Sequence, residues 1–353
     1  MNPVLSLARP EILTLKPYAH ASWLPALTRM HANEAPWRPT GDITAAGLNR
    51  YPEPQPRALI ERMADLYGVL PEQLLCSRGA DEAIDILSRV YLRAGTDAIL
   101  QFGPTFGMYQ VAARIQGAEV IELPLSRDDG WRIDPQRLLD AWHPAIKLIY
   151  LCSPNNPTAN LLEETALEAV CTALDGKAII VIDEAYVEWS SRASLARWLG
   201  RFETLAILRT LSKAHALAGA RVGALLASSQ LIQLARKVIP PYALAQPAIE
   251  AALSALAPAE LAASQQRLDA LLLEKDYLRR GLERCVLVEK VWPSDTNFLM
   301  IDCIDAGAFM SKSTAGGLIV RDLRAHPLLP RSLRVSVGTR AQNDALLNTV
   351  GSK

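Results

Sequence analysis

The chain has 353 residues, 50% of them hydrophobic, so it is long enough to bury a large core and to form more than one domain. Its 37 basic and 37 acidic side chains balance to a formal net charge of +0, and the basic ones are scattered, which argues against binding to nucleic acid or to a membrane surface. The five cysteines are widely spaced without a CxxC pair, which is typical of reduced core thiols and not of a disulfide framework or a metal site.

The first 50 residues show no regular pattern and are rich in proline, tryptophan and asparagine. Met1–Leu15 contains charged residues and two prolines, so it lacks the apolar core of a secretory leader. No apolar run further along reaches the length of a membrane span. We therefore expect a cytoplasmic protein whose partners are small molecules, with no nucleic acid, membrane or metal ion among them.

Short apolar strands and amphipathic helices alternate through the middle of the chain. A helical pattern runs from about Pro54 to Tyr67. The predicted strands after it are Leu74–Ser77, Ala98–Gln101, Glu119–Leu123, Leu148–Cys152, Ala178–Ile182 and Thr204–Leu208, and the predicted helices are Ala80–Arg93, Thr105–Gln116 and Leu161–Leu174. Continuously apolar strands separated by helices indicate an α/β fold with a mainly parallel sheet covered by helices on both faces.

The last third of the chain predicts a smaller α+β domain. Pro240-Pro241 is read as a linker, and a long amphipathic helix, Glu260–Leu282, follows it. The later predicted strands are Val286–Glu289, Asn297–Asp302, Gly317–Val320 and Leu333–Val337, with helices near 305–313 and 340–350. We expect an N-terminal arm over residues 1–40 that associates with the small domain, a large domain over 41–245 and the small domain over 246–353.

The stretch that follows the strand Thr204–Leu208 contains the most reactive candidate. Lys213 lies among small and apolar residues just past a buried strand, and a partly desolvated lysine is a nucleophile that forms Schiff bases. Ser212 and Arg221 beside it offer a hydroxyl and a planar guanidinium, which suit a phosphate. From this stretch alone, an ordinary loop lysine remains an equal alternative.

Polar residues also follow the other buried strands, where ligands bind in α/β sheets. Gly79, Ala80 and Asp81 open a helix after the first strand, and the free N–H groups there form an anion site. The alternative is that Asp81 only caps its own helix.

Asp183 ends the strand Ala178–Ile182, where a carboxylate is costly unless it meets a cation or several donors. A protonated pyridine nitrogen is such a cation, and Tyr186 could reach a phenolic oxygen on the same ring. A metal-binding or nucleotide-binding aspartate is the alternative, but no GxxxxGK[ST] motif is present. Asn156, in the rigid turn Ser153–Thr158, is aimed back over the strand ends.

Pyridoxal 5'-phosphate needs a Schiff-base lysine, an acidic partner for its ring nitrogen and a phosphate cradle. The residues described above meet these needs together, and Phe106 at the start of a helix could cover the ring face.

With these motifs, the chain resembles the histidinol-phosphate aminotransferase family of fold-type I pyridoxal-phosphate enzymes over nearly its whole length. The motifs that carry the resemblance are LNRYPEPQP (48–56), SRGADE (77–82), GPTFGMY (103–109), CSPNNPT (152–158), IDEAYVEW (182–189), LRTLSKAHALAGARVG (208–223), TNF (296–298), GLIVRD (317–322) and LRVSVGTR (333–340). RYPEPQP, SRGADE and the C-terminal arginines are narrower than the others, which related aminotransferases share. The resemblance implies a seven-stranded, mainly parallel sheet in the large domain and a homodimer with shared active sites.

The resemblance also implies roles for individual residues. Lys213 would hold the cofactor as a Schiff base and, once released, move the proton between the substrate Cα and the cofactor C4′. The residues implied to contact the cofactor are Asp183 at the pyridinium, Tyr186 and Asn156 at the phenolic oxygen, and Ala80, Asp81, Ser212 and Arg221 at the phosphate, with Tyr51 reaching that phosphate from the neighbouring subunit. The residues implied to bind substrate are Arg334, helped by Arg321, and Asn33 in the pocket lining.

The implied reaction is a ping-pong transamination in histidine biosynthesis, between L-histidinol phosphate with 2-oxoglutarate and imidazole-acetol phosphate with L-glutamate. Alternatives are a threonine-phosphate decarboxylase, an aromatic amino-acid aminotransferase and, least favoured, a cofactor-sensing regulatory domain. Arg321 and Arg334 could also be ordinary arginines of edge strands. The sequence departs from the family pattern at Ala159, where glycine is usual, at Phe106, where tyrosine is commoner, and in the run 31–36.

Overall fold

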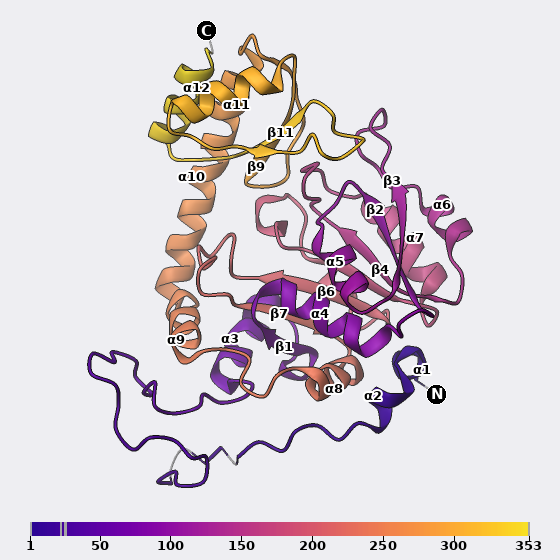
Figure 1. Ribbon diagram of the computed structural model, residues 1–353, viewed down its shortest axis with the longest axis vertical. Helices are drawn as coiled ribbons and strands as arrows, with labels where there is room; N and C mark the ends of the chain where they lie inside the picture. Colours follow the sequence, from indigo (N-terminus) through magenta and orange to yellow (C-terminus); the bar gives the residue numbers. More distant parts are fainter. Residues whose placement is uncertain (1, 22, 25–26, 352–353) are drawn as a thin grey trace.

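The computed structural model describes residues 2–21, 23–24 and 27–351. Two β-sheets organise these residues: a seven-stranded sheet of order β1-β7-β6-β5-β4-β2-β3 and a four-stranded sheet of order β10-β11-β9-β8. Figure 1 shows that the long helix α10 (Pro258–Glu283) runs along one side of the molecule from the first sheet to the second. We call the seven-stranded sheet the large sheet and the four-stranded sheet the C-terminal sheet.

The large sheet is mainly parallel and is covered by helices, which confirms the predicted fold class. Its strands are β1 (Leu74–Ser77), β2 (Ala98–Gly103), β3 (Glu119–Pro124), β4 (Ile146–Cys152), β5 (Ile179–Asp183), β6 (Leu205–Thr210) and β7 (Gly223–Ala227). The helices and 3-10 turns around it are α3 (Arg57–Tyr67), η1 (Pro71–Gln73), α4 (Gly79–Tyr91), α5 (Met108–Ile115), α6 (Pro135–Ala141), α7 (Glu164–Leu174), η2 (Val187–Trp189), η3 (Leu195–Trp198), α8 (Ser229–Val238) and α9 (Gln246–Ala255). The prediction missed β7, which pairs antiparallel with both β1 and β6.

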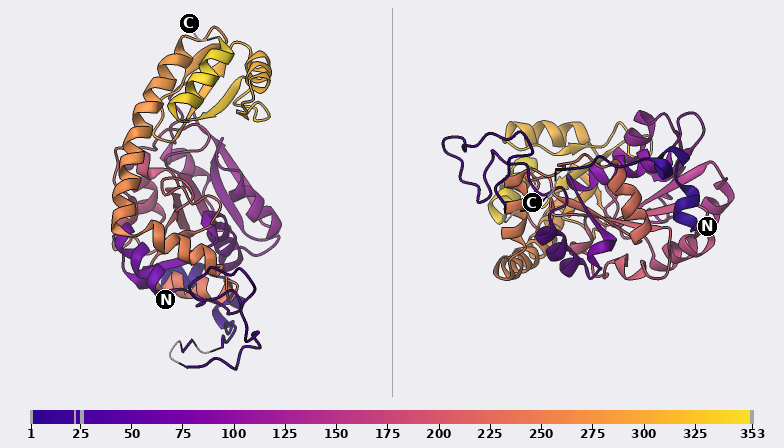
Figure 2. Two further views of the ribbon diagram at one scale, coloured as in Figure 1. Left: turned by 90° about the vertical axis from the view of Figure 1, so that its left-hand side faces the viewer. Right: turned by 90° about the horizontal axis from the view of Figure 1, so that it is seen from below.

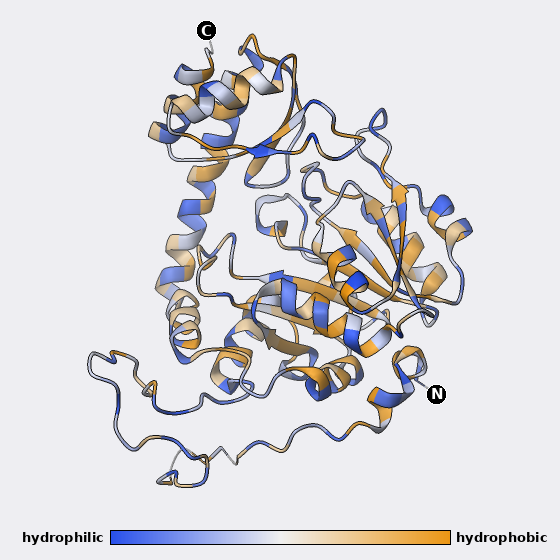
Figure 3. Cartoon of the chain, in the orientation of Figure 1, coloured by the Kyte–Doolittle hydropathy of each residue, from blue (hydrophilic) through white to orange (hydrophobic). Residues whose placement is uncertain are grey.

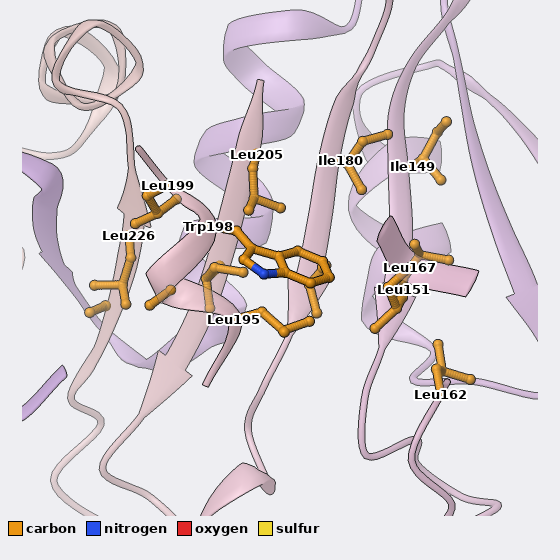
Figure 4. Packing of buried hydrophobic residues seen from close by; sticks show 14 of the residues in the cluster. Ile149, Leu151, Leu162, Leu167, Ile180, Leu195, Trp198, Leu199, Leu205 and Leu226 are labelled. Atoms are coloured by element: carbon orange, nitrogen blue, oxygen red, sulfur yellow. The ribbon is translucent and has the colours of Figure 1, made fainter. Parts of the chain in front are cut away.

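Both faces of the large sheet are buried, which explains its continuously apolar strands (Figure 3). In β5, Ile180 and Ile182 enter the cluster on one face, while Ile179 and Val181 enter the cluster on the other. On the first face Trp198 lies among leucines from several elements, as Figure 4 shows. Burying each such side chain contributes roughly 1.5–3 kcal/mol to the free energy of unfolding. This packing holds the ends of the strands in fixed positions.

The C-terminal sheet has a separate core. Its elements are β8 (Val288–Val291), β9 (Phe298–Cys303), α11 (Ala306–Ala315), β10 (Arg321–Asp322), β11 (Ser332–Ser336) and α12 (Arg340–Val350). Leu278 and Leu282 of α10 pack there with Phe309 and Leu346. The predicted strand over 317–320 is wrong: α11 ends at a turn in which Gly317 has a φ of +77°, and pairing starts only at residue 321.

The chain leaves the large-sheet core later than the predicted boundary at residue 245. Pro240 and Pro241 do lie in an irregular link after α8. The next helix, α9, nevertheless packs back on α3, with Ile249 and Ala252 in the same cluster as Leu59. The crossing to the C-terminal sheet therefore occurs along α10.

The start of the chain lies far from the C-terminal sheet (Figures 1 and 2), so its predicted association with the small domain is wrong for residues 3–14. These residues form α1 (Pro3–Leu7) and α2 (Pro10–Thr14), which pack on α8. Val4, Ala8 and Ile12 recur every four residues and enter the second cluster of the large sheet, which is the physical reason. In the part of the chain that the structure describes, no helix is both long enough and apolar enough to cross a membrane.

Candidate active site

The loops that follow the carboxyl ends of the parallel strands converge on one cavity. Its lining residues are Ala80, Asp81, Phe106, Cys152, Asn156, Asp183, Ala185, Tyr186, Thr210, Ser212, Lys213 and Arg221. Apart from Cys152, Ala185 and Thr210, every one of these is a residue for which the sequence predicts a role. The predicted cofactor-binding residues of this chain are thus brought together, except for Tyr51 and for Gly79, which directly precedes the lining residue Ala80.

One wall of the cavity is the N-terminus of α4. Gly79 has a φ of +75°, and a Cβ at this position would lie 2.6 Å from Nη2 of Arg221. The absent side chain therefore lets the guanidinium approach the first turn of the helix, where Ala80 and Asp81 follow. The N–H groups of that turn have no partner within the helix and favour an anion.

Arg221 completes this corner of the cavity. Its guanidinium donates to Oγ of Ser212 at 3.2 Å and to a carboxylate oxygen of Asp81 at 3.0 Å. No side-chain hydrogen bond caps α4, so the Asp81 carboxylate is not the helix cap of the alternative interpretation. A helix N-terminus, a hydroxyl and a guanidinium in one corner form a cradle for a phosphate.

Asp183 lies at the buried end of β5 and is 3% exposed. Its carboxylate accepts hydrogen bonds from the Tyr109 hydroxyl at 2.6 Å and from the Ala185 N–H at 3.0 Å. Burial raises the pKa of Asp183 to about 6, although the Tyr109 hydrogen bond opposes the rise. A rise of about two units disfavours the ionised form by about 3 kcal/mol. Among the described residues no lysine or arginine forms an ion pair with Asp183, so a cationic ligand group would recover this energy.

Tyr109 is a site residue that the sequence argument missed. It is fully buried and stacks on Tyr150 with ring centres 4.5 Å apart. It follows Phe106 by three residues, and the two rings meet edge to face at 5.6 Å. That spacing inside the GPTFGMY motif places both rings on one side of the start of α5. The same spacing could have indicated from the sequence that Tyr109 lies near the site.

Lys213 stands at the mouth of the cavity. Its Nζ lies 5.7 Å from the centre of the Tyr186 ring. By area the residue is exposed, but its side chain is partly desolvated, as the sequence predicts. The surrounding chain lowers the pKa of the amine, first through desolvation and second through the nearby Arg334 cation. Both effects favour the neutral, nucleophilic form.

A chain of polar contacts links the large sheet to the C-terminal sheet across the cavity. Asn156 is 8% exposed and its amide donates to the Tyr186 hydroxyl at 3.5 Å. The amide oxygen of Asn156 accepts a hydrogen bond from Arg334 of β11. Arg334 also lies 5.1 Å from the Phe298 ring centre, and burial lowers the pKa of its guanidinium.

Arg321 is the direct neighbour of Arg334. The two residues are paired across the antiparallel strands β10 and β11, so their side chains leave the same face of the C-terminal sheet. Arg321 is exposed, whereas Arg334 is half-buried. Two guanidinium groups on one face, next to the cavity, suit an anionic substrate and do not resemble scattered edge arginines.

Tyr51 and Asn33 are not brought into the cavity by this chain. Both line a separate surface pocket that also includes Glu34. The Tyr51 backbone N–H donates to Glu34, and its ring stacks on Tyr242 with centres 4.5 Å apart. Their predicted roles therefore need a second chain.

The backbone conformation at Ala159 explains why the family usually has glycine at this position. It has a φ of +67°, in the left-handed region that favours glycine, and it is fully buried beside Tyr186 and Phe298. Its N–H bonds to Asn155 at 2.8 Å, so the turn that holds Asn156 is formed despite the methyl group. The departure at Ala159 is thus absorbed locally.

The comparison with known proteins agrees with this site. A family model for aminotransferase class I and II matches residues 34–350, which places the chain in that family. A histidinol-phosphate aminotransferase of Stenotrophomonas maltophilia (strain R551-3) is 42% identical over 357 residues, covering 100% of this chain and 98% of the relative. The chain therefore belongs to the histidinol-phosphate aminotransferase family.

Solved structures show the same fold. The histidinol-phosphate aminotransferase of Sinorhizobium meliloti in complex with pyridoxal-5'-phosphate has a TM-score of 0.78 and 25% identity, covering 85% of this chain and 82% of that one. The L-threonine-O-3-phosphate decarboxylase of Porphyromonas gingivalis has a TM-score of 0.72 and 23% identity, covering 86% and 90%. The second likeness concerns the fold alone.

The cavity fits pyridoxal 5'-phosphate, the cofactor of this family. The first turn of α4 and the Arg221 guanidinium can bind the phosphate together, because Gly79 has no Cβ that would clash with Arg221. Asp183 is a buried carboxyl that a ring cation would pair with, and Lys213 has a lowered pKa. No group of three or more histidine, cysteine or acidic residues suited to a metal ion occurs within the described ranges.

Proposed function

We propose that this chain transfers an amino group between L-histidinol phosphate and 2-oxoglutarate, giving imidazole-acetol phosphate and L-glutamate. The observation that carries the proposal is that one cavity joins Lys213, Asp183 and a phosphate cradle, with Arg334 at its edge. The identity of 42% over the whole chain supports the choice of this reaction within the class.

The site residues that follow the strands of the large sheet have separate roles in this proposal. Lys213 would hold the cofactor and, as a free amine, would carry the proton between the substrate Cα and the cofactor C4′. Asp183 would pair with the protonated ring nitrogen, and Tyr186 and Asn156 would hold the phenolic oxygen. When bound, pyridoxal phosphate withdraws electrons from the substrate Cα and stabilises the carbanion formed there.

Arg334 and Arg321 account for substrates that differ in shape but share negative charge. A guanidinium binds a carboxylate or a phosphate through the same planar pair of N–H groups. We assign Arg334 to the α-carboxylate of glutamate and to the phosphate of the other substrate, with Arg321 assisting. A lysine could offer only a point charge at this place.

The active enzyme in this proposal is a cytoplasmic homodimer. Apolar side chains exposed along the N-terminal segment support a surface that a second copy covers: Leu13, Leu15, Tyr18, Trp23, Leu24, Leu27, Met30, Trp37, Ile43, Leu48 and Tyr51. Tyr51 would reach the cofactor phosphate of the partner, and Asn33 beside it would line the partner's substrate pocket. The five buried, unpaired cysteines are typical of a reducing compartment.

Product analysis tests the proposal against its alternatives. The purified holoenzyme is mixed with L-histidinol phosphate and 2-oxoglutarate, and glutamate is measured over time. We expect glutamate to form in step with loss of histidinol phosphate. Release of carbon dioxide from threonine phosphate, without need for an oxo acid, would instead identify a decarboxylase, and turnover confined to aromatic amino acids would identify the other aminotransferase.

A further inference from the structure

Several contacts hold the C-terminal sheet next to the large sheet. One is α10, which runs along one side of the molecule (Figure 1) and bonds through Ser264 to the Ala214 carbonyl at 3.1 Å, while Leu278 near its other end lies in the C-terminal core. A second is formed by Arg127, in the loop after β3, and Asp302, at the end of β9. We call this second connection the Arg127–Asp302 link.

The link is an ion pair between a half-buried arginine and a buried carboxylate. The Arg127 guanidinium donates to the Asp302 carboxylate at 2.6 Å and to the Leu328 carbonyl at 3.2 Å. It lies 5.5 Å from the ring centres of both Trp131 and Trp292. The planar guanidinium therefore sets the direction of both hydrogen bonds to the C-terminal part, and it lies against a pair of contacting Trp rings.

The loop on the large-sheet side is shaped to present this arginine. Ser126 and Arg132 form an isolated β-bridge, and the Trp131 N–H bonds to the Ser126 carbonyl at 2.7 Å. Trp131 is 1% exposed and holds a φ of +66°, which is costly for a bulky residue. Such strain persists only where surrounding contacts enforce it, and it marks functional segments.

On the C-terminal side, Asp302 of the link lies on the strand next to β11, which carries Arg334. Asp302 is 1% exposed and also accepts from Trp292 at 2.7 Å and from Ser332 at 2.5 Å. Ser332 is paired with Asp302 in the sheet, and Arg334 is paired with Met300. Residues two apart on a strand share a face and lie about 7 Å apart. Arg127 thus grips the same face of the C-terminal sheet from which Arg334 reaches Asn156.

Apolar packing accompanies the link at this place. Trp292 and Met300 of the C-terminal part lie in the same buried cluster as Trp131, and the Trp131 and Trp292 ring centres are 5.3 Å apart. A cavity of about 650 Å³, lined by Arg127, Trp131, Trp292 and Asp302 among others, lies beside this contact. The Arg127–Asp302 link is therefore the charged and directional part of an otherwise apolar contact. When Arg127 is removed, Asp302 keeps two donors, so the C-terminal core should stay folded.

We propose that Arg127 is a positioning residue for substrate binding: through Asp302 it holds β9 and β11 so that Arg334 faces the cofactor cavity. This inference rests on the proposed role of Arg334 but not on the identity of the amino donor. A shift of about 1 Å in such a group can cost a hundredfold in rate. The cofactor site itself is built by the large sheet and should not depend on the link.

The test measures binding of 2-oxoglutarate to the pyridoxal form of the holoenzyme by titration calorimetry. That form carries no amino group to transfer, so the titration reports binding alone. Arg127→Met should raise the dissociation constant for 2-oxoglutarate at least tenfold, while the cofactor dissociation constant changes less than twofold. In steady state, KM for glutamate should rise at least tenfold with a smaller change in kcat. Arg127→Lys should recover part of the binding, because an ammonium can reach Asp302 without the Leu328 contact.

Arg132→Met is the matched control, since Arg132 lies in the same loop and pairs only with the exposed Asp129 and Glu163 among the described residues. It should leave both constants unchanged. Unchanged 2-oxoglutarate binding in Arg127→Met would overturn the inference, and so would a parallel loss of cofactor, which indicates a general structural role. Wild-type holoenzyme that does not bind 2-oxoglutarate would also overturn it. Failure to use histidinol phosphate, with 2-oxoglutarate binding intact, would contradict only the proposed function.

Discussion

The large sheet and the C-terminal sheet place their functional residues in different ways. In the large sheet, residues of the cofactor cavity follow the ends of strands that are buried on both faces, so the core fixes their positions. Arg334 lies instead on a small antiparallel sheet that has its own core on one side, and it reaches the cavity through contacts between the two sheets. Cofactor binding therefore depends on the rigidity of one core, whereas substrate binding depends on how two cores are held together.

This difference predicts separable effects of mutation. Changes at the strand ends of the large sheet should affect the cofactor and all substrates alike. Changes in the C-terminal sheet or in its contacts should affect substrate affinity and leave the cofactor in place. The largest effects are expected at the strand ends.

Lys213→Ala should lower turnover by at least about a thousandfold, because it removes both the nucleophile and the proton carrier. The visible absorbance of the lysine-bound cofactor should disappear, and borohydride should no longer attach the cofactor to the chain. Absorbance spectra and mass spectrometry of the reduced protein check this. A variant that keeps a reducible, coloured cofactor would contradict the assignment of Lys213.

Asp183 should make cofactor affinity depend on pH. Its pKa is raised to about 6 in the cofactor-free chain, so below that pH the carboxyl must lose a proton before it can pair with a ring cation. The cofactor dissociation constant should accordingly rise by up to about tenfold per unit as pH falls below 6, and should level off above it. Titration of wild type and Asp183→Asn across this range checks this.

Asp183→Asn should bind the cofactor about a hundredfold more weakly at pH 7.5, and the added pH dependence should be absent. Titration of the cofactor phosphate is common to both proteins and cancels in the comparison. Identical pH profiles for the two proteins would show that Asp183 does not pair with the ring.

Arg334→Ala should raise KM for glutamate and for the phosphorylated substrate by about 10- to 100-fold each, since each loses charged hydrogen bonds. The cofactor dissociation constant should stay within twofold of wild type. Steady-state kinetics with each substrate varied in turn check this. A rise for one substrate alone would refute the dual role and would assign the other anion to a different residue.

Tyr51→Phe should have the smallest effect, a rise of about two- to tenfold in the cofactor dissociation constant, which is the value of one hydrogen bond. Removing only the hydroxyl keeps the stack on Tyr242. Mixed dimers of Tyr51→Phe and Lys213→Ala chains sharpen the test, because one site then keeps both Lys213 and Tyr51 while the other site has neither, so the intact site should bind the cofactor with wild-type affinity. Unchanged cofactor affinity in Tyr51→Phe would remove Tyr51 from the site.

The sequence predicts the large-sheet half of the site well for a physical reason. Buried parallel strands are recognisable as apolar runs, and residues such as Asp183 and Lys213 follow those runs directly. Tyr109 was missed because its contact with Asp183 depends on how α5 packs on the large sheet, which no local pattern records. β7 was missed because its five residues directly follow the Arg221 turn and resemble a continuation of it.

The other half of the site depends on contacts between distant parts of the chain. The N-terminal helices were expected at the small domain, yet an apolar repeat through Val4 and Ile12 places them against α8. The adjacency of Arg321 and Arg334 follows from strand pairing, and the Arg127–Asp302 link joins residues 175 positions apart. Only a structure makes such neighbours visible.

We propose that Lys213, Asp183 and the phosphate cradle hold a cofactor that accepts an amino group from L-histidinol phosphate. A single turnover of the purified pyridoxal form with L-histidinol phosphate, without any oxo acid, tests this when it is followed by visible absorbance. We expect rapid loss of the lysine-bound cofactor band and its return when 2-oxoglutarate is added. A spectrum that stays unchanged with histidinol phosphate but responds to glutamate or to an aromatic amino acid would contradict the substrate assignment. A spectrum unchanged by every amino donor would contradict transamination itself.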